Sequence, residues 1–139
     1  MLTAQEQTLV AQAISTAEKN TSGELRVHME KVCTQDPVQR AIAVFEKLGM
    51  HQTAARNGVL IYVATESNQL AIIGDKGINE LVPANFWDST RDLMITHFKS
   101  GQITEGLCAA IAEAGQQLAN YFPYEDNDQN ELSNEISFG

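Results

Sequence analysis

The residues Val59-Leu60-Ile61-Tyr62-Val63-Ala64 form an unbroken apolar run, with Asn57-Gly58 before it and Glu66-Ser67-Asn68 after it. A short apolar run between turn residues, rich in β-branched and aromatic side chains, is typical of a strand that is buried on both faces. Such a strand needs a covering layer on each face of its sheet. The run therefore indicates a central strand inside a layered α/β domain.

Two neighbouring segments predict further strands. Residues 24–32 alternate between apolar and polar side chains, and residues 69–73 follow the turn at Glu66-Ser67-Asn68 and form a hairpin with the central strand. In the first strand, one face carries Leu25, Val27 and Met29, and the other carries Arg26, His28 and Glu30. We interpret the second face as polar and expect His28 to be solvated.

Four helices account for most of the remaining chain. The first opens with the capping box Thr3-Ala4-Gln5-Glu6, and the second begins at Pro37, continues through Val38, Ile42, Phe45 and Leu48, and ends at Gly49. Two more are expected over residues 85–99 and 104–121. A strand–helix–strand unit makes the first two strands parallel, and the hairpin makes the third antiparallel. The predicted fold is α/β, with a mixed central sheet between helices in three layers, α/β/α.

Composition narrows the functional classes. The chain has 139 residues, 43% of them hydrophobic, and a formal net charge of −9. Because it has no basic surface to offer phosphates, we exclude nucleic acid and an anionic membrane surface as partners. A signal peptide pattern and an apolar run of membrane-spanning length are both missing, so we expect a cytoplasmic protein without direct membrane insertion.

The chain length indicates one domain, with residues 1–123 as its body and residues 124–139 as an acidic, irregular tail of the same domain. The tail carries five acids, namely Glu125, Asp126, Asp128, Glu131 and Glu135, and no basic residue. Cys33 and Cys108 belong to no zinc-type cluster, so we expect two reduced thiols; the alternative is a disulfide in an exported protein.

The predicted topology brings three loops to one edge of the sheet. The first two strands start there and the third ends there, so Gly23-Glu24, Arg56-Asn57-Gly58 and Gly74-Asp75-Lys76-Gly77 should converge. Glu24 and Asp75 offer the oxygen ligands that Ca²⁺ or Mg²⁺ prefers, and Asp88 on the next helix could add another. Arg56 could bind a carboxylate or a phosphate. The alternative is an ion-pair cluster of Glu24, Arg56 and Asp75 that only ties the loops together.

Several segments in this order resemble the TPM domain family, and the resemblance extends over essentially the whole chain. They are 22–27 (SGELRV), 56–62 (RNGVLIY), 73–78 (IGDKGI), Phe86-Trp87, Phe98 with Gly101 and Gly106-Leu107, and the ending 122–136. The chain is most similar to short, stand-alone bacterial members. The resemblance implies the layered fold above, divalent metal binding, and a polar cleft at Glu24, Arg56 and Asp75, with Asp88 as a further match. Known members include an acid phosphatase and a receptor-modulating membrane protein, which implies a membrane-associated protein partner.

Three functions follow as hypotheses. The first is a regulatory or interaction module that binds a divalent cation through Glu24, Asp75 and Asp88. The second is a weak, metal-dependent acid phosphatase in which Asp75 helps to hold the metal and Arg56 holds the phosphate. The third is a structural adaptor that needs no metal. We rank binding ahead of catalysis, because no committed nucleophile is present and phosphomonoesters hydrolyse very slowly without strong catalysis.

Overall fold

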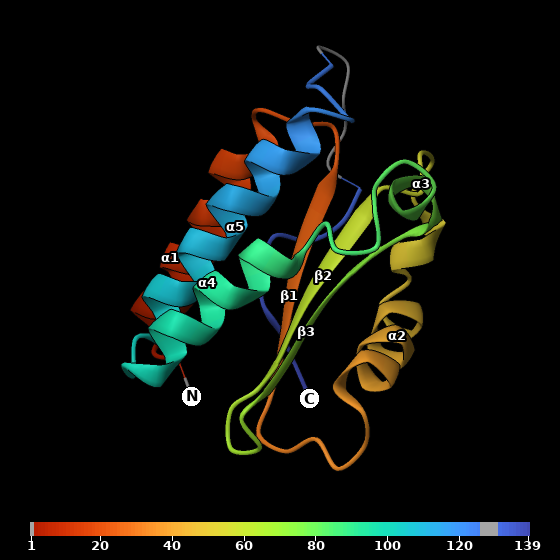
Figure 1. The fold of residues 1–139 in the computed structure, drawn as a ribbon. Coiled ribbons are helices and arrows are strands. Elements are labelled where there is room, and N and C mark those ends of the chain that lie inside the picture. Colours follow the sequence, from red (N-terminus) through yellow and green to blue (C-terminus); the bar gives the residue numbers. More distant parts are fainter. Residues whose placement is uncertain (1, 126–130) are drawn as a thin grey trace.

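The computed structural model describes residues 2–125 and 131–139 of the chain (Figure 1). The elements in chain order are α1 (Ala4–Glu18), β1 (Glu24–Glu30), α2 (Pro37–Lys47), a short 3₁₀ helix η1 (Met50–Gln52), β2 (Gly58–Ala64), β3 (Gln69–Gly74), α3 (Lys76–Asn79), α4 (Asp88–Lys99), α5 (Ile103–Ala119) and β4 (Ser137–Phe138). The capping box at Thr3 is formed, because the Thr3 hydroxyl accepts from the Glu6 N–H and the Glu6 carboxylate accepts from the Thr3 N–H.

The sheet is mixed and has the strand order β3-β2-β1-β4. β1 pairs with β2 in parallel and β2 pairs with β3 antiparallel, as the connections predicted. Every residue of β2 is buried, which agrees with its unbroken apolar sequence. The predicted fold class is confirmed.

Helices cover both faces of the sheet. In Figure 1, α1, α4 and α5 lie on one side and α2 lies on the other. Side chains of β1 and β2 such as Val27 and Ile61 pack into the core beneath α1, α4 and α5. Leu60 and Tyr62 of β2 point the other way, into a smaller core with Phe45 of α2. The alternation along β2 therefore supplies both cores.

Helices α1 and α5 approach each other closely at Gly115. A Cβ atom at this position would lie 2.8 Å from the Cβ of Ala17, which is closer than two carbon atoms pack. Because this close approach buries both helices against the sheet, the cost of about 1 kcal/mol for glycine inside a helix is tolerated here.

Helix α2 turns more of its apolar surface to solvent than its spacing suggested. Phe45 is buried, but Val38 and Ile42 are 45% and 41% exposed. The residues that seal the core together with Phe45 are instead Ala41 and Val44, which lie to one side of Val38 and Ile42 on the helix. Val38 and Ile42 form one wall of a surface groove described below.

Three elements differ from the sequence-based expectations. The expected helix at 85–99 begins only at Asp88, because residues 83–86 form a turn closed by the Phe86 N–H to Pro83 O hydrogen bond. Helix α3 was not expected, since Gly77 disfavours a helix; Asp75 caps it. Residues 137–138 form β4, paired in parallel with β1, within a segment expected to be irregular. Two acids of that segment, Asp126 and Asp128, lie outside the described residues.

Candidate functional site

The three loops predicted to converge do meet at one edge of the sheet. The Glu24 N–H donates to the Asn57 carbonyl at 3.2 Å, and the Asp75 N–H donates to the Gly58 carbonyl at 2.9 Å. β1 pairs Glu24 with Gly58, and the hairpin continues this row to Asp75. Because side chains alternate between faces along each strand, Glu24 and Asp75 project from the same face of the sheet, the one that α2 covers.

Arg56 and Asp75 form a two-point ion pair. The Arg56 Nε and Nη2 atoms donate to the two Asp75 oxygens at 2.7 and 2.8 Å, and the Lys76 N–H adds a third hydrogen bond at 2.7 Å. Burial alone would raise the pKa of Asp75, but the Arg56 guanidinium and the Lys76 N–H hold the pKa of this carboxyl below its usual value. The Asp75 carboxylate is therefore ionised and committed to these donors.

The loop around Arg56 needs a close backbone approach. Arg56 has φ of 51°, in the left-handed region, and its carbonyl accepts from the Gly77 N–H at 2.9 Å. A Cβ atom on Gly77 would clash with the Ala55 carbonyl at 2.4 Å. Gly77 is therefore required to bring α3 against this loop and to place Asp75 under Arg56.

Glu24 interacts with the far end of the chain. Its Oε1 atom accepts from the backbone N–H groups of Glu131 and Leu132, at 2.5 and 3.4 Å, and the residue is 97% buried by its surroundings, with only 3% exposed. Leu132 lies over Gly58, where its Cδ1 is 3.6 Å from the position that a Cβ would take. The C-terminal segment (residues 131–139) therefore occupies the space between Glu24 and Asp75.

The C-terminal segment is anchored at further points. The Glu131 carboxylate accepts from the Ala54 N–H at 3.2 Å, next to the Arg56 loop. At the other end of the segment, the Gly139 N–H donates to the Met29 carbonyl at 2.9 Å. The segment thus runs along β1 from Glu24 to Met29, and it was not predicted from sequence because its ladder with β1 is only two residues long.

A pocket beside Glu24 is lined by side chains with oxygen atoms that could bind a cation. The pocket, of about 200 Å³, is lined by Glu18 of α1, Glu24 of β1 and Asn134 of the C-terminal segment, together with Ser15, Lys19, Gly23 and Tyr124. The Glu18 Oε2 atom also accepts from the Leu25 N–H at 2.9 Å, which fixes the end of α1 to the start of β1. Two carboxylate residues and an asparagine thus line one small pocket.

Asp88 is not part of this arrangement. It begins α4, its side chain is 55% exposed, and its neighbour is Arg91 at 3.7 Å. Among the described residues, no three His, Cys, Asp or Glu side chains form a group able to hold a metal ion. Glu24, Asp75 and Asp88 therefore do not make up a three-carboxylate centre.

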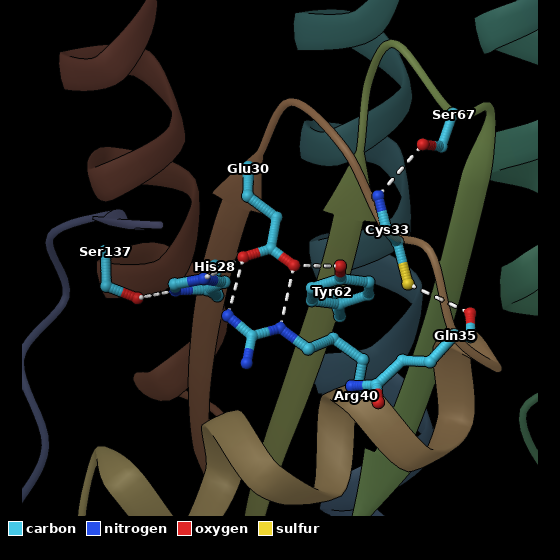
Figure 2. A network of polar contacts seen from close by, with 8 residues as sticks. All are labelled: His28, Glu30, Cys33, Gln35, Arg40, Tyr62, Ser67 and Ser137. Carbon is cyan, nitrogen blue, oxygen red and sulfur yellow. Dashed lines mark hydrogen bonds and ion pairs between the residues drawn. The ribbon is translucent and has the colours of Figure 1, made fainter.

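A buried polar network at the other end of β1 was missed by the sequence reasoning (Figure 2). Glu30 accepts from the Nε and Nη2 atoms of Arg40, at 2.9 and 2.8 Å, and from the Tyr62 hydroxyl. These donors, with Arg40 first, lower the pKa of Glu30 to about 2. The expectation of a solvated His28 is wrong, since His28 is 5% exposed, stacks on Tyr62, and shares a 2.8 Å hydrogen bond between its Nδ1 and Ser137 Oγ.

The sequence contained a signal for this network that the alternation pattern hid. His28 and Glu30 occupy the face of β1 that α2 covers, and a Tyr at position 62 lies in a run otherwise fully apolar. Cys33 follows β1 and its thiol contacts the Gln35 carbonyl at 3.2 Å. Cys33 and Cys108 are both free thiols, and burial raises the pKa of Cys108.

The structure thus defines a small three-layer α/β/α domain whose C-terminal segment closes over an acidic sheet edge. Within the described part of the chain, no helix has the length and apolarity to cross a membrane. The TPM domain model matches residues 1–117, and the chain therefore belongs to the TPM domain family.

Solved structures agree with this assignment. The NMR structure of BA42 from the psychrophilic bacterium Bizionia argentinensis is 50% identical, with a TM-score of 0.94 over 100% of this chain and 96% of that one. The N-terminal domain of a protein from P. gingivalis is 16% identical, with a TM-score of 0.72 over 91% of this chain and 83% of that one. The N-terminal domain of cg2496 from Corynebacterium glutamicum is 11% identical (TM-score 0.67; 94% and 80%) and, like the previous one, shares the fold alone. No curated protein matches the chain.

Proposed function

We propose that the chain is an interaction module that binds a divalent cation, Ca²⁺ or Mg²⁺, in the pocket between Glu18, Glu24 and Asn134. The observation that carries the proposal is the meeting of two carboxylates and an amide at one pocket of about 200 Å³. Oxygen ligands of this kind suit both ions, and Ca²⁺ in particular accepts irregular sets of carboxylate and amide oxygens. The net charge of −9 favours cation binding as well.

The pocket also suggests how binding would regulate the module. Glu24 contacts the cation pocket and also accepts the N–H groups of Glu131 and Leu132, while Asn134 forms part of the pocket wall. A cation held by Glu24 and Asn134 would therefore stabilise the docked C-terminal segment. By linkage, release of that segment would lower the affinity of the pocket for the cation.

Asp75 has a different role in this proposal from the one its sequence suggested. Its two oxygens are engaged by Arg56 and by the Lys76 N–H, so it acts as a structural tie between the loop and α3. These hydrogen bonds also make the phosphatase alternative less favourable. Arg56 and Asp75, the residues assigned to phosphate and metal in that alternative, are bound to each other.

Titration with CaCl₂, followed by amide NMR shifts, tests the site. We expect saturable shifts at Glu18, Glu24, Leu25 and Asn134, and Glu24→Gln should remove them. Lys19→Gln should tighten binding, because it removes a positive charge from the pocket wall. Shifts confined to Asp75, Lys76 and Asp88, or the same titration curve for Glu24→Gln, would show that the cation binds elsewhere.

The partner is proposed only by class, as a membrane-associated protein. Capture of such a partner by the immobilised chain, in Ca²⁺ and in chelator, separates a cation-regulated module from a metal-independent adaptor. The module requires capture to change with Ca²⁺. Equal capture in both conditions favours the adaptor.

A further inference from the structure

Strand β3 lies at the edge of the sheet opposite to β4, and its outer side is unpaired within the described residues. The Asp75 N–H points to Gly58 of β2, so the alternation of an antiparallel ladder directs the N–H and C=O groups of Leu70 and Ile72 outward. Asn79 caps only the Gly74 carbonyl, at 2.9 Å. Residues 69–74 contain neither a charged residue nor proline, the features that commonly block an exposed edge.

Hollows on opposite faces of the sheet flank this edge. Figure 1 shows β3 running between α4 on one side and α2 on the other. The end of β3 and α2 enclose a groove of about 640 Å³, with Val38, Ile42 and Trp87 among its apolar walls. The start of β3 and α4 enclose a second hollow of about 330 Å³, lined in part by Leu70, Ile95 and Phe98.

We propose that the outer edge of β3 binds an extended peptide segment of another protein, which joins the sheet as a fifth strand. The outward N–H and C=O groups of Leu70 and Ile72 supply the main-chain hydrogen bonds. Successive side chains of an added strand point to opposite faces, so alternate apolar side chains would enter the α2 groove and the α4 hollow. The proposal does not depend on the cation site.

The surroundings of β3 favour a peptide over a second copy of the chain. A second copy would have to bring its own α2 and α4 beside the same edge, whereas an extended peptide brings no helices. Charged groups of both signs line the α2 groove, where Arg56 pairs with Asp75 and Lys76 lies 3.9 Å from Glu80. Glu46, also on the groove wall, forms no ion pair with another described residue, and this carboxylate favours a basic residue in the peptide.

The test uses a blocked seven-residue probe peptide of five valines with a lysine at each end, so that apolar side chains face both hollows. We expect saturable amide shifts of the full-length protein at Leu70, Ile72 and Gly74, with Kd at or below about 1 mM. The same peptide with every backbone nitrogen methylated should not bind, because it lacks N–H donors. Shifts at Ser137 and Phe138 instead, or equal binding of the methylated peptide, would overturn the proposal.

Two variants sharpen the test. Ile72→Pro removes an N–H that points away from β2, and should weaken the probe about tenfold while the β2–β3 ladder is retained. Glu46→Lys, which leaves the edge itself intact, should weaken the lysine-bearing probe, whereas the matched change Glu105→Lys on α5 should not. Unchanged binding by Glu46→Lys and Ile72→Pro contradicts the proposal. So does a dimer of the wild-type chain that Ile72→Pro dissociates, because the occupant would then be a second copy.

Discussion

The Glu24 carboxylate accepts a 2.5 Å hydrogen bond from the backbone N–H of Glu131, which lies 107 positions further along the chain. This contact joins the start of β1 to the C-terminal segment. Glu24 is buried, and it also borders the pocket with Glu18 and Asn134. One side chain thus connects the proposed cation site with the segment that closes the sheet edge.

Glu24→Ala should release the C-terminal segment. The change removes the acceptor for two backbone N–H groups, so we expect a loss of about 1–2 kcal/mol in the free energy of unfolding. Hydrogen exchange should speed up at Leu132 and Gly139, with urea denaturation giving the stability. Glu24→Gln, which keeps one acceptor oxygen, should retain most of the protection. Unaltered exchange in Glu24→Ala would mean that β4 pairing alone holds the segment.

The ion pair between Arg56 and Asp75 should contribute only modestly to the free energy of unfolding. Asp75 is buried but the Arg56 side chain is 44% exposed, so solvent screens the interaction. A double-mutant cycle with Arg56→Gln and Asp75→Asn should give a coupling energy of about 1 kcal/mol. Additive single changes would show that the ion pair contributes nothing measurable.

Turnover of a generic aryl phosphate should be the same for the wild type and Asp75→Asn. The prediction follows because Asp75 is engaged by Arg56 and Lys76 and is not available to a metal. A clear loss of turnover in Asp75→Asn, with the fold intact, would support the phosphatase alternative.

Glu30 should make the stability depend on acid pH. Its hydrogen bonds from Arg40 lower its pKa from the usual 4.5 to about 2. A carboxyl whose folded pKa is depressed stabilises the protein above the unfolded pKa, so this contribution should be lost as the pH falls from about 4.5 to about 2. Glu30→Gln should be less stable than the wild type at pH 7, and the difference should shrink across that range in thermal unfolding. A constant difference would contradict this origin.

His28 should also make the stability depend on pH, at higher pH values than Glu30 does. Burial lowers the pKa of His28 below its usual 6.5, although Glu30 opposes the shift and Arg40 and Lys47 add to it. Below about pH 6.5 the unfolded chain protonates this ring first, so the folded state should lose stability as the pH falls. His28→Gln should lack this part of the slope. The same slope in the variant would assign it to another group.

Much of the fold could be predicted because it depends on local patterns. The apolar run of β2, the capping box at Thr3 and the turn before β3 each act over a few residues, and the connections between them fixed the parallel and antiparallel pairings. From that topology alone, the meeting of Glu24, Arg56 and Asp75 at one sheet edge could be anticipated.

What could not be predicted depends on contacts between distant segments. Glu24 accepts from the backbone N–H of Glu131. Because every residue except proline has a backbone N–H, the sequence does not indicate which one Glu24 binds. His28 appeared to lie on a solvated face because alternation does not reveal that α2 and β4 cover it. Asp88 was assigned to the site because the start of the next helix was expected to face the same cleft, whereas Asp88 at the start of α4 is exposed and lies beside Arg91.

Calorimetric titration of the full chain with CaCl₂ is the decisive measurement for the cation site. We expect saturable binding to the wild type, binding at least about tenfold weaker in Glu24→Gln (about 1.4 kcal/mol) and wild-type binding in Asp88→Asn, which changes an exposed carboxylate away from the pocket. Equal affinities for the wild type and Glu24→Gln would contradict the proposed site.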